Sequence, residues 1–308
     1  MKIIGIGETV YDIIFRNNQP DKAVPGGSTY NAMISLGRTL GRSGVPCMMI
    51  SETGDDHIGR IIADFTEKNH VSSEYITINH GTKSHISLAF LDENNDAQYE
   101  FYKDHKHADI PNHFPKVNHD DLVLFGSFFA INPVIRPMTR AFLSQAYASG
   151  ATLYYDINFR RNHQADLPLV KDNIEENYKF ATIVRGSADD FDFLYGTKDA
   201  SYIYNRYILP HCDNFILTDG ANSITVFTPE INGMSISVEP ITTVSTIGAG
   251  DNFNAGFLYG MATQGTALTE TNLKIIIGIA QRFAQCVCQS IYNYVDEDFA
   301  ENLCALKK

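Results

Sequence analysis

Short apolar segments alternate with segments of helical periodicity along most of the chain, and this alternation constrains the fold more than any other feature. Apolar strands that are bounded by Gly, Asp or Asn and separated by helices predict a mostly parallel sheet covered on both faces. The expected strands are Lys2–Gly5, Cys47–Ser51, Leu122–Phe125, Thr152–Asp156, Ile183–Arg185, Phe215–Thr218 and Ile224–Thr228. The expected helices are Thr29–Thr39, Ile58–Lys68, Val134–Ser149, Ile174–Lys179, Asp189–Leu194, Asp251–Thr263 and Leu273–Ser290.

One region departs from this alternation. His85–Leu91 and Gln98–Lys103 alternate apolar and polar residues, and the sequence DENND between them has turn-forming chemistry. This pattern predicts an antiparallel hairpin, with Val10–Phe15 as a further strand. We therefore expect a single α/β domain over residues 1–308, with a small lid formed by about residues 10–24 and 84–107.

Composition and charge exclude several classes of partner. The 308 residues carry a formal net charge of −12, which argues against nucleic acid and anionic membrane, since both favour a basic protein face. An anionic small ligand remains compatible, because backbone dipoles can bind phosphate on an acidic protein. No apolar run reaches the roughly 18 residues of a membrane span. The five cysteines are odd in number and scattered, which predicts reduced thiols and a cytoplasmic protein.

The sequence STIGAGDNFNAG, from Ser245 to Gly256, is the first candidate site. Thr242–Thr246 is β-prone and a helical pattern follows, so we expect Gly248–Asp251 at a strand-to-helix turn. Glycines there leave backbone N–H groups uncovered, and the helix N-terminus adds positive potential, which together favour binding of developing negative charge. Asp251 would then accept a proton from a substrate hydroxyl, or it would only cap the helix.

Two further motifs lie near the N-terminus. In PGGSTYNAM, from Pro25 to Met33, the pair Gly26-Gly27 precedes a helix that carries Asn31 in its first turn. Asparagine offers a donor and an acceptor for sugar hydroxyls, although a glycine turn before a helix has a purely structural explanation too. Asp12 follows the carboxyl end of the first strand, which is where ligands bind in open parallel sheets.

Seven motifs in order resemble those of the ribokinase-like carbohydrate kinases, the PfkB family, over almost the whole chain. They are Gly7-Glu8 with Asp12, PGGSTYNAMISLGRTLG (Pro25–Gly41), GDDHIGR (Gly54–Arg60), DINFR (Asp156–Arg160), RGSADDFDFL (Arg185–Leu194), LTDGANS (Leu217–Ser223) and STIGAGDNF. DINFR is similar to a motif of fructokinase-like and 2-keto-3-deoxygluconate-kinase-like members.

The resemblance implies a fold, an activity and a set of residue roles. The fold is α/β, a ribokinase-like three-layer α/β/α arrangement with a central, mostly parallel sheet plus a small β lid. The activity is the ATP-dependent phosphorylation of a sugar hydroxyl, most like that of fructokinase, with Mg²⁺ as cofactor. The implied catalytic residues are Asp251 as base and the Gly248, Ala249 and Gly250 backbone as anion hole. The implied sugar-binding residues are Asp12, Gly26, Gly27, Asn31 and Arg160. The implied nucleotide-binding residues are Ser187, Asp190, Thr218 and Gly220, with Asp190 reaching Mg²⁺ through water.

Two positions depart from the family pattern. Ser245 stands where the family usually has an aspartate in a region that helps to bind a monovalent cation, which puts K⁺ activation in doubt. Asp190 replaces a more common glutamate and is one methylene shorter, so its reach to metal-bound water is reduced.

Several alternatives remain open on the sequence. A sugar-acid kinase would need an extra cation, for which Arg160 is the candidate, and a nucleoside kinase would need an aromatic pocket, for which the lid offers Phe90, Phe101 and Tyr102. A non-catalytic sugar- or nucleotide-binding protein on the same fold is the alternative from another class. A homodimer formed through the lid is compatible with its alternating strands.

Overall fold

The structure is a computed structural model that describes residues 1–91, 97–104 and 113–305. The chain forms two compact units. Unit 1 comprises Met1, Lys116–Pro240 and Gln264–Ile275, and unit 2 comprises Lys2–Pro115, Ile241–Thr263 and Ile276–Lys308. In the part of the chain that the structure describes, no helix is both long and apolar enough to cross a membrane.

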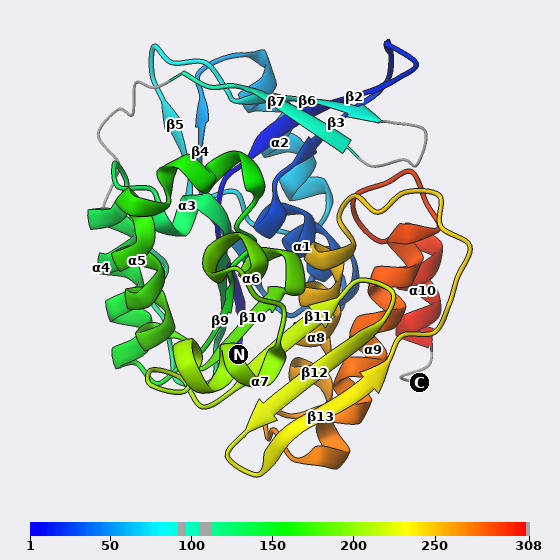
Figure 1. The fold of residues 1–308 in the computed structure, drawn as a ribbon. Coiled ribbons are helices and arrows are strands. Elements are labelled where there is room, and N and C mark those ends of the chain that lie inside the picture. The colour runs from blue at the N-terminus through cyan, green and yellow to red at the C-terminus, as the bar shows by residue number, and fades with distance from the viewer. Residues whose placement is uncertain (92–96, 105–112, 306–308) are drawn as a thin grey trace. The chain divides into compact units, whose positions relative to one another are not determined.

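Unit 1 is built on a sheet in which four strands, consecutive in the sequence, pair in parallel (Figure 1). These are β8 (Leu122–Gly126), β9 (Thr152–Asp156), β10 (Ile183–Ser187) and β11 (Phe215–Asp219). The strands β12 (Ser223–Thr228) and β13 (Ile231–Ser237) continue the sheet in antiparallel pairing. Every residue of β8 is buried, as expected for a parallel strand with both faces covered.

The helices of unit 1 follow the strands in the predicted alternation. They are α3 (Ser127–Ile131), α4 (Arg136–Ala148), α5 (Leu167–Phe180), α6 (Ala188–Tyr195) and α7 (Ala200–Ile203), with the 3₁₀ segment η2 (Arg161–Asp166) and the π segment η3 (Tyr204–Ile208). Phe142 on α4 and Ile174 on α5 are buried, so the apolar stripe of each helix faces the core.

Unit 2 contains three parallel strands in the order β1-β4-β5, namely β1 (Ile3–Ile6), β4 (Cys47–Gly54) and β5 (Ile76–Asn79). Its helices are α1 (Ser28–Leu36), which continues into the π segment η1 (Gly37–Gly41), α2 (His57–Lys68), α8 (Ala249–Gln264) and α10 (Glu297–Ala305). Helix α9 (Glu270–Cys288) begins in unit 1, and its residues from 276 onward belong to unit 2.

Unit 2 also carries a separate four-stranded sheet in the order β3-β2-β6-β7 (Figure 1). Its strands are β2 (Val10–Arg16), β3 (Gln19–Gly26), β6 (Ile86–Leu91) and β7 (Ala97–Tyr102). The predicted β6–β7 hairpin and the additional strand at Val10–Phe15 are confirmed, and β2 pairs with β6 in parallel. Residues 92–96 and 105–107 of the expected lid lie outside the described residues, and a lid function for this sheet stays a prediction.

All seven strands and all seven helices predicted from the alternation are present, and their ends shift by a few residues except at α5, which begins at Leu167 and not at Ile174. The elements that were not expected are the strands β3, β5 and β13 and the helices α3, α7 and α10. Strand β5 has only four residues, and two of them are buried, so it carries too little alternation to be distinguished from a loop.

Candidate active site

The carboxylate of Asp251 lies at the start of α8 and is almost completely buried, with 6% of its surface exposed. Its Oδ2 accepts a hydrogen bond of 2.8 Å from Nδ2 of Asn31 on α1. The Oδ1 of Asn31 is buried and has no hydrogen-bond partner among the described residues. Because a buried amide oxygen without a partner is unfavourable, this atom is available to a ligand hydroxyl beside Asp251.

The loop before α8 differs from the sequence prediction in one respect. Thr242–Thr246 does not form a strand, so Gly248–Asp251 joins an irregular segment to a helix. The backbone N–H groups of Val244 and Ser245 both donate to the carbonyl of Cys288, at the end of α9, at 2.7 and 3.2 Å. A helix end therefore binds this segment where a neighbouring strand was expected.

Gly248 is a glycine for two physical reasons. Its φ of +79° lies in the left-handed region, and a Cβ atom there would stand 2.8 Å from the carbonyl oxygen of Asn293. The loop thus passes directly against the backbone of Asn293 and turns into α8, whose first N–H groups lack intrahelical partners. This geometry suits the binding of negative charge.

Asp12 and the glycine pair lie together at the junction of β2, β3 and α1. Asp12 on β2 is 7% exposed, and its Oδ2 accepts a hydrogen bond from Nδ2 of Asn293 at 3.3 Å. A Cβ at Gly26 would lie 2.0 Å from that same oxygen, and a Cβ at Gly27, where φ is +125°, would lie 2.3 Å from the carbonyl of Glu8. Both glycines are therefore needed for the backbone to approach these two acidic residues.

Glu8 is held by a histidine and a lysine within unit 2. Its Oε1 lies 2.8 Å from Nδ1 of His85 and 2.6 Å from Nζ of Lys103. Burial alone would raise the pKa of Glu8, but the hydrogen bond from His85 and the charge of Lys103 outweigh burial and lower it to about 2. The carboxylate next to the glycine pair is thus ionised over the whole neutral range.

The candidate nucleotide residues lie in unit 1, at the carboxyl ends of β10 and β11. Ser187 caps α6 in a capping box, because its hydroxyl accepts from the N–H of Asp190 while the carboxylate of Asp190 accepts from the N–H of Ser187 at 2.7 Å. Burial, together with the negative charge of Asp156, raises the pKa of Asp190 to about 6. Both residues therefore have a local structural role in addition to any contact with phosphate.

Arg185 is a residue of this region that the motif analysis did not assign to the site. Its buried guanidinium donates to Oδ1 of Asp156 at 2.9 Å and to Oγ1 of Thr218 at 2.6 Å, so it connects the ends of β9, β10 and β11. Charged hydrogen bonds of this kind fix the orientation of both acceptors. An arginine inside an apolar strand was the available signal, since buried arginines are almost always paired.

The remaining predicted residues are more exposed. Arg160 is exposed, and its Nε donates to Oδ1 of Asn158 at 3.4 Å. Gly220 has a φ of +50° in the turn between β11 and β12, with open space where a Cβ would point. The backbone there can approach a ligand closely, as the motif requires.

The predicted residues thus fall into two groups. Unit 2 holds Asp12, Gly26, Gly27, Asn31 and Gly248–Asp251, which is a buried carboxylate, amides and a helix N-terminus suited to a polyhydroxyl ligand. Unit 1 holds Arg160, Ser187, Asp190, Thr218 and Gly220. Two further residues, Asn252 and Asn293, contact the first group and were not predicted from the sequence.

Comparison with known proteins gives a consistent result. The pfkB family of carbohydrate kinases matches residues 2–297. Probable fructokinase-7 of Arabidopsis thaliana is 25% identical over 259 residues, which span 81% of this chain and 73% of that protein.

Solved structures show the same fold. Aminoimidazole riboside kinase from Salmonella enterica, complexed with aminoimidazole riboside and an ATP analog, superposes with a TM-score of 0.84 at 21% identity and covers 100% of both chains. A double mutant of fructokinase from Vibrio cholerae O395, in fructose-, ADP- and potassium-bound form, has a TM-score of 0.83 at 18% identity over 98% of both chains. The predicted three-layer α/β fold is confirmed.

Proposed function

Because this chain belongs to the pfkB family of carbohydrate kinases, we propose that it transfers the γ-phosphoryl group of ATP to a hydroxyl of fructose. It is an ATP-dependent phosphotransferase that acts on a sugar hydroxyl. Fructose is the proposed sugar, since the Arabidopsis relative is named a probable fructokinase and the Vibrio structure holds fructose. The observation that carries the proposal is the buried Asp251 carboxylate at the N-terminus of α8, held by Asn31.

In this proposal each residue of unit 2 has a definite part. Asp12 and the unpaired Oδ1 of Asn31 bind sugar hydroxyls, while Gly26 and Gly27 let the backbone approach them. Asp251 accepts the proton of the attacking hydroxyl. The backbone of Gly248, Ala249 and Gly250, with the dipole of α8, stabilises the negative charge that develops on the transferred group.

Unit 1 would bind the nucleotide and the metal ion. Thr218 and Gly220 would line the nucleotide site, Ser187 would contact phosphate, and Arg160 would lie near the sugar or the transferred group.

Among the described residues no cluster of three or more His, Cys, Asp or Glu side chains could hold a metal by itself. Mg²⁺ in kinase sites is typically held by substrate phosphates, water and one or two carboxylates, and Asp190 would serve here through water. Burial and the neighbouring charge of Asp156 raise the pKa of Asp190, so a cation at this place would favour its ionised form. When bound, Mg²⁺ neutralises phosphate charge.

We expect little or no activation by K⁺. Ser245 offers a neutral hydroxyl, and this hydroxyl already accepts a hydrogen bond of 3.2 Å from the N–H of Ile247. The measurement compares turnover in K⁺ with turnover in tetramethylammonium at equal ionic strength. A large increase of rate in K⁺ would contradict this part of the proposal.

A homodimer through the four-stranded sheet is a further part of the proposal. Strand β7 is an edge strand in the sheet order, and it exposes 37% of Phe101 and 57% of Tyr102. An open edge with aromatic side chains favours pairing with a second copy. Sedimentation velocity should give a dimer for the native chain and a monomer for Tyr102→Lys, and a native monomer at all concentrations would refute it.

We also propose a cytoplasmic location. Cys47, Cys212, Cys286 and Cys288 are free thiols. Burial raises the pKa of Cys212 to about 11, so its thiol is unreactive at neutral pH. Free, unreactive cysteines agree with a reducing compartment that also supplies ATP.

The decisive experiment is a substrate panel with coupled detection of ADP. Fructose, other hexoses, 2-keto-3-deoxygluconate and aminoimidazole riboside are each offered with ATP and Mg²⁺. We expect the highest kcat/KM with fructose. A higher kcat/KM with another sugar would show that this sugar, and not fructose, is the preferred substrate. If no compound leads to ADP formation, the proposal that the protein is a sugar kinase is wrong.

A further inference from the structure

Two buried asparagines that have no part in the function proposed above connect Asp12 to the loop before α8. Asn252 is 0% exposed and Asn293 is 1% exposed, and both belong to unit 2. Their contacts join four segments that are far apart in the sequence: β2, α1, the loop ending at Asp251, and the segment that follows α9. We call Asn252 and Asn293 together the asparagine bridge.

Asn252 directly fixes the loop that carries Asp251. Its Nδ2 donates to the carbonyls of Gly248 and Asn293, both at 2.8 Å, and its Oδ1 accepts from the hydroxyl of Ser35. The carbonyl of Gly248 also accepts from the backbone N–H of Asn252 at 2.9 Å. Since the peptide unit is planar, holding this carbonyl orients the whole peptide through which the chain enters α8.

Asn293 connects Asn252, at the start of α8, to Asp12. Its side-chain Nδ2 donates to Oδ2 of Asp12 at 3.3 Å, while its backbone carbonyl accepts from Asn252. The side chain of Asn293 therefore holds Asp12, and its backbone carbonyl holds Asn252 at the start of α8. These two functions can be separated by substitution, because truncating the side chain leaves the carbonyl in place.

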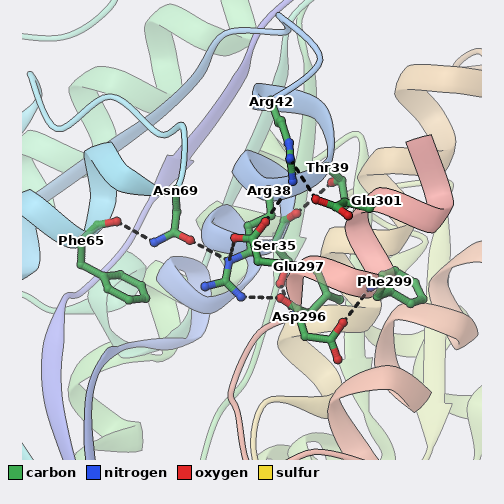
Figure 2. A network of polar contacts seen from close by, with 11 residues as sticks. Ser35, Arg38, Thr39, Arg42, Phe65, Asn69, Asp296, Glu297, Phe299 and Glu301 are labelled. Atoms are coloured by element: carbon green, nitrogen blue, oxygen red, sulfur yellow. Dashed lines mark hydrogen bonds and ion pairs between the residues drawn. The ribbon is translucent and has the colours of Figure 1, made fainter. Parts of the chain in front are cut away.

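The segment that follows α9, in which Figure 2 labels Asp296, contacts Ser35 on α1 and Arg38 on η1. The N–H of Val295 donates to the hydroxyl of Ser35 at 3.1 Å, and the carbonyl of Val295 accepts from Arg38 at 2.7 Å. The guanidinium of Arg38 also lies 4.7 Å from the ring centre of Tyr294 and donates to Asn69 at 2.6 Å. A segment restrained on both sides of its backbone can hold a neighbouring side chain in one position.

We propose that Asn252 and Asn293 are positioning residues that hold the sugar-binding carboxylate of Asp12 and the loop of Asp251 in one fixed relation. The inference rests on the proposed function and deepens it. Asn293 orients Asp12 for the sugar, and Asn252 orients the loop for transfer. Loss of the Asn293 side chain weakens sugar binding, and loss of the Asn252 side chain slows the chemical step.

The test is a comparison of steady-state constants for Asn293→Ala and Asn252→Ala with fructose as the varied substrate. Asn293→Ala removes a hydrogen bond to a carboxylate, so the KM for fructose should rise about tenfold. Its kcat should stay near the native value. Asn252→Ala displaces the loop, so kcat should fall about 10²-fold with little change of KM.

Two further variants separate positioning from general stability. Asn252→Ser can still bond to the carbonyl four residues earlier, Gly248, and should therefore recover much of kcat. Asn177→Ala in unit 1 is the matched control, since Asn177 is also 0% exposed and accepts from Arg136 at 2.7 Å. It should lower the unfolding temperature and leave both kinetic constants near native values.

Hydrogen exchange gives a readout that does not depend on turnover. The amides of residues 245–253 should exchange faster in Asn252→Ala than in the native protein or in Asn177→Ala. Faster exchange together with the split between KM and kcat supports the inference. Unchanged exchange in this loop, or equal effects of both bridge variants on KM and kcat, overturns it. If the native protein phosphorylates no sugar, the proposed function fails, and the exchange experiment alone decides the inference.

Discussion

Asp251 is the residue on which the proposed chemistry depends most. Its carboxylate is buried at a helix N-terminus and accepts a hydrogen bond from the amide of Asn31. Asp251→Asn keeps the shape and the capping capacity of the side chain but cannot accept a proton. We expect kcat to fall by about 10²–10⁴-fold.

Affinity for ATP, measured by calorimetry on the same variant, should be nearly unchanged, because the candidate nucleotide residues belong to unit 1. Turnover close to that of the native enzyme would show that Asp251 is a structural cap.

Glu8 gives a prediction about pH at the same scale. Its pKa is about 2 in the folded protein and near the ordinary 4.5 in the unfolded chain. The ionised carboxylate of Glu8 therefore stabilises the folded protein fully above pH 4.5, and this contribution to the free energy of unfolding is lost as pH falls from 4.5 toward 2. At about 1.4 kcal/mol per pH unit, the loss amounts to at most about 3 kcal/mol.

Urea unfolding at pH 5 and pH 3 measures this loss. Glu8→Gln retains the shape without the charge, so its unfolding free energy should decrease less between the two pH values. Equal decreases in both proteins would mean that the contacts with Lys103 and His85 do not persist in solution.

Among the secondary-structure elements, the entry into α8 depends on a glycine. An alanine at Gly248 would combine an unfavourable φ of +79° with a Cβ 2.8 Å from the carbonyl of Asn293. We expect Gly248→Ala to lose about 1–3 kcal/mol of stability and about 10²-fold in kcat, because the loop must move.

Gly44→Ala is a matched control in the same unit. Gly44 has a φ of +91°, but nothing lies within 4 Å of the position that a Cβ would take there, so this variant has the backbone strain without the collision. It should lose stability and keep kcat. Equal kcat in both variants would indicate that the position of the loop does not limit the reaction.

Over the molecule as a whole, the candidate sugar and nucleotide residues divide between the two units, apart from Arg160. Fructose alone and ATP alone should therefore each stabilise the protein against thermal unfolding. Binding at 100 times Kd contributes about 2.7 kcal/mol, which thermal unfolding readily detects. Asp12→Ala should abolish the increase in Tm caused by fructose and retain the increase caused by ATP. Loss of both increases would mean that Asp12 maintains more than the sugar site.

The elements were predictable because each depends on local periodicity. Buried parallel strands such as β8 and β9 are continuous apolar runs, and α2 and α5 repeat their apolar residues at helical spacing. The segment at Thr242–Thr246 was predicted wrongly, since β-prone residues form a strand only where another strand pairs with them, and here the end of α9 binds the backbone.

The α/β class, the hairpin of the four-stranded sheet, and the glycines and acids of the motifs could all be predicted from the amino-acid sequence, because they follow from periodicity and from short fixed spacings. The partners of those residues could not, and they emerge only in the folded chain. Asn293 lies 281 positions from Asp12, and Arg185 lies 29 positions from Asp156, yet each pair is hydrogen-bonded. Such contacts depend on how distant segments fold together, and no local pattern in the chain records them.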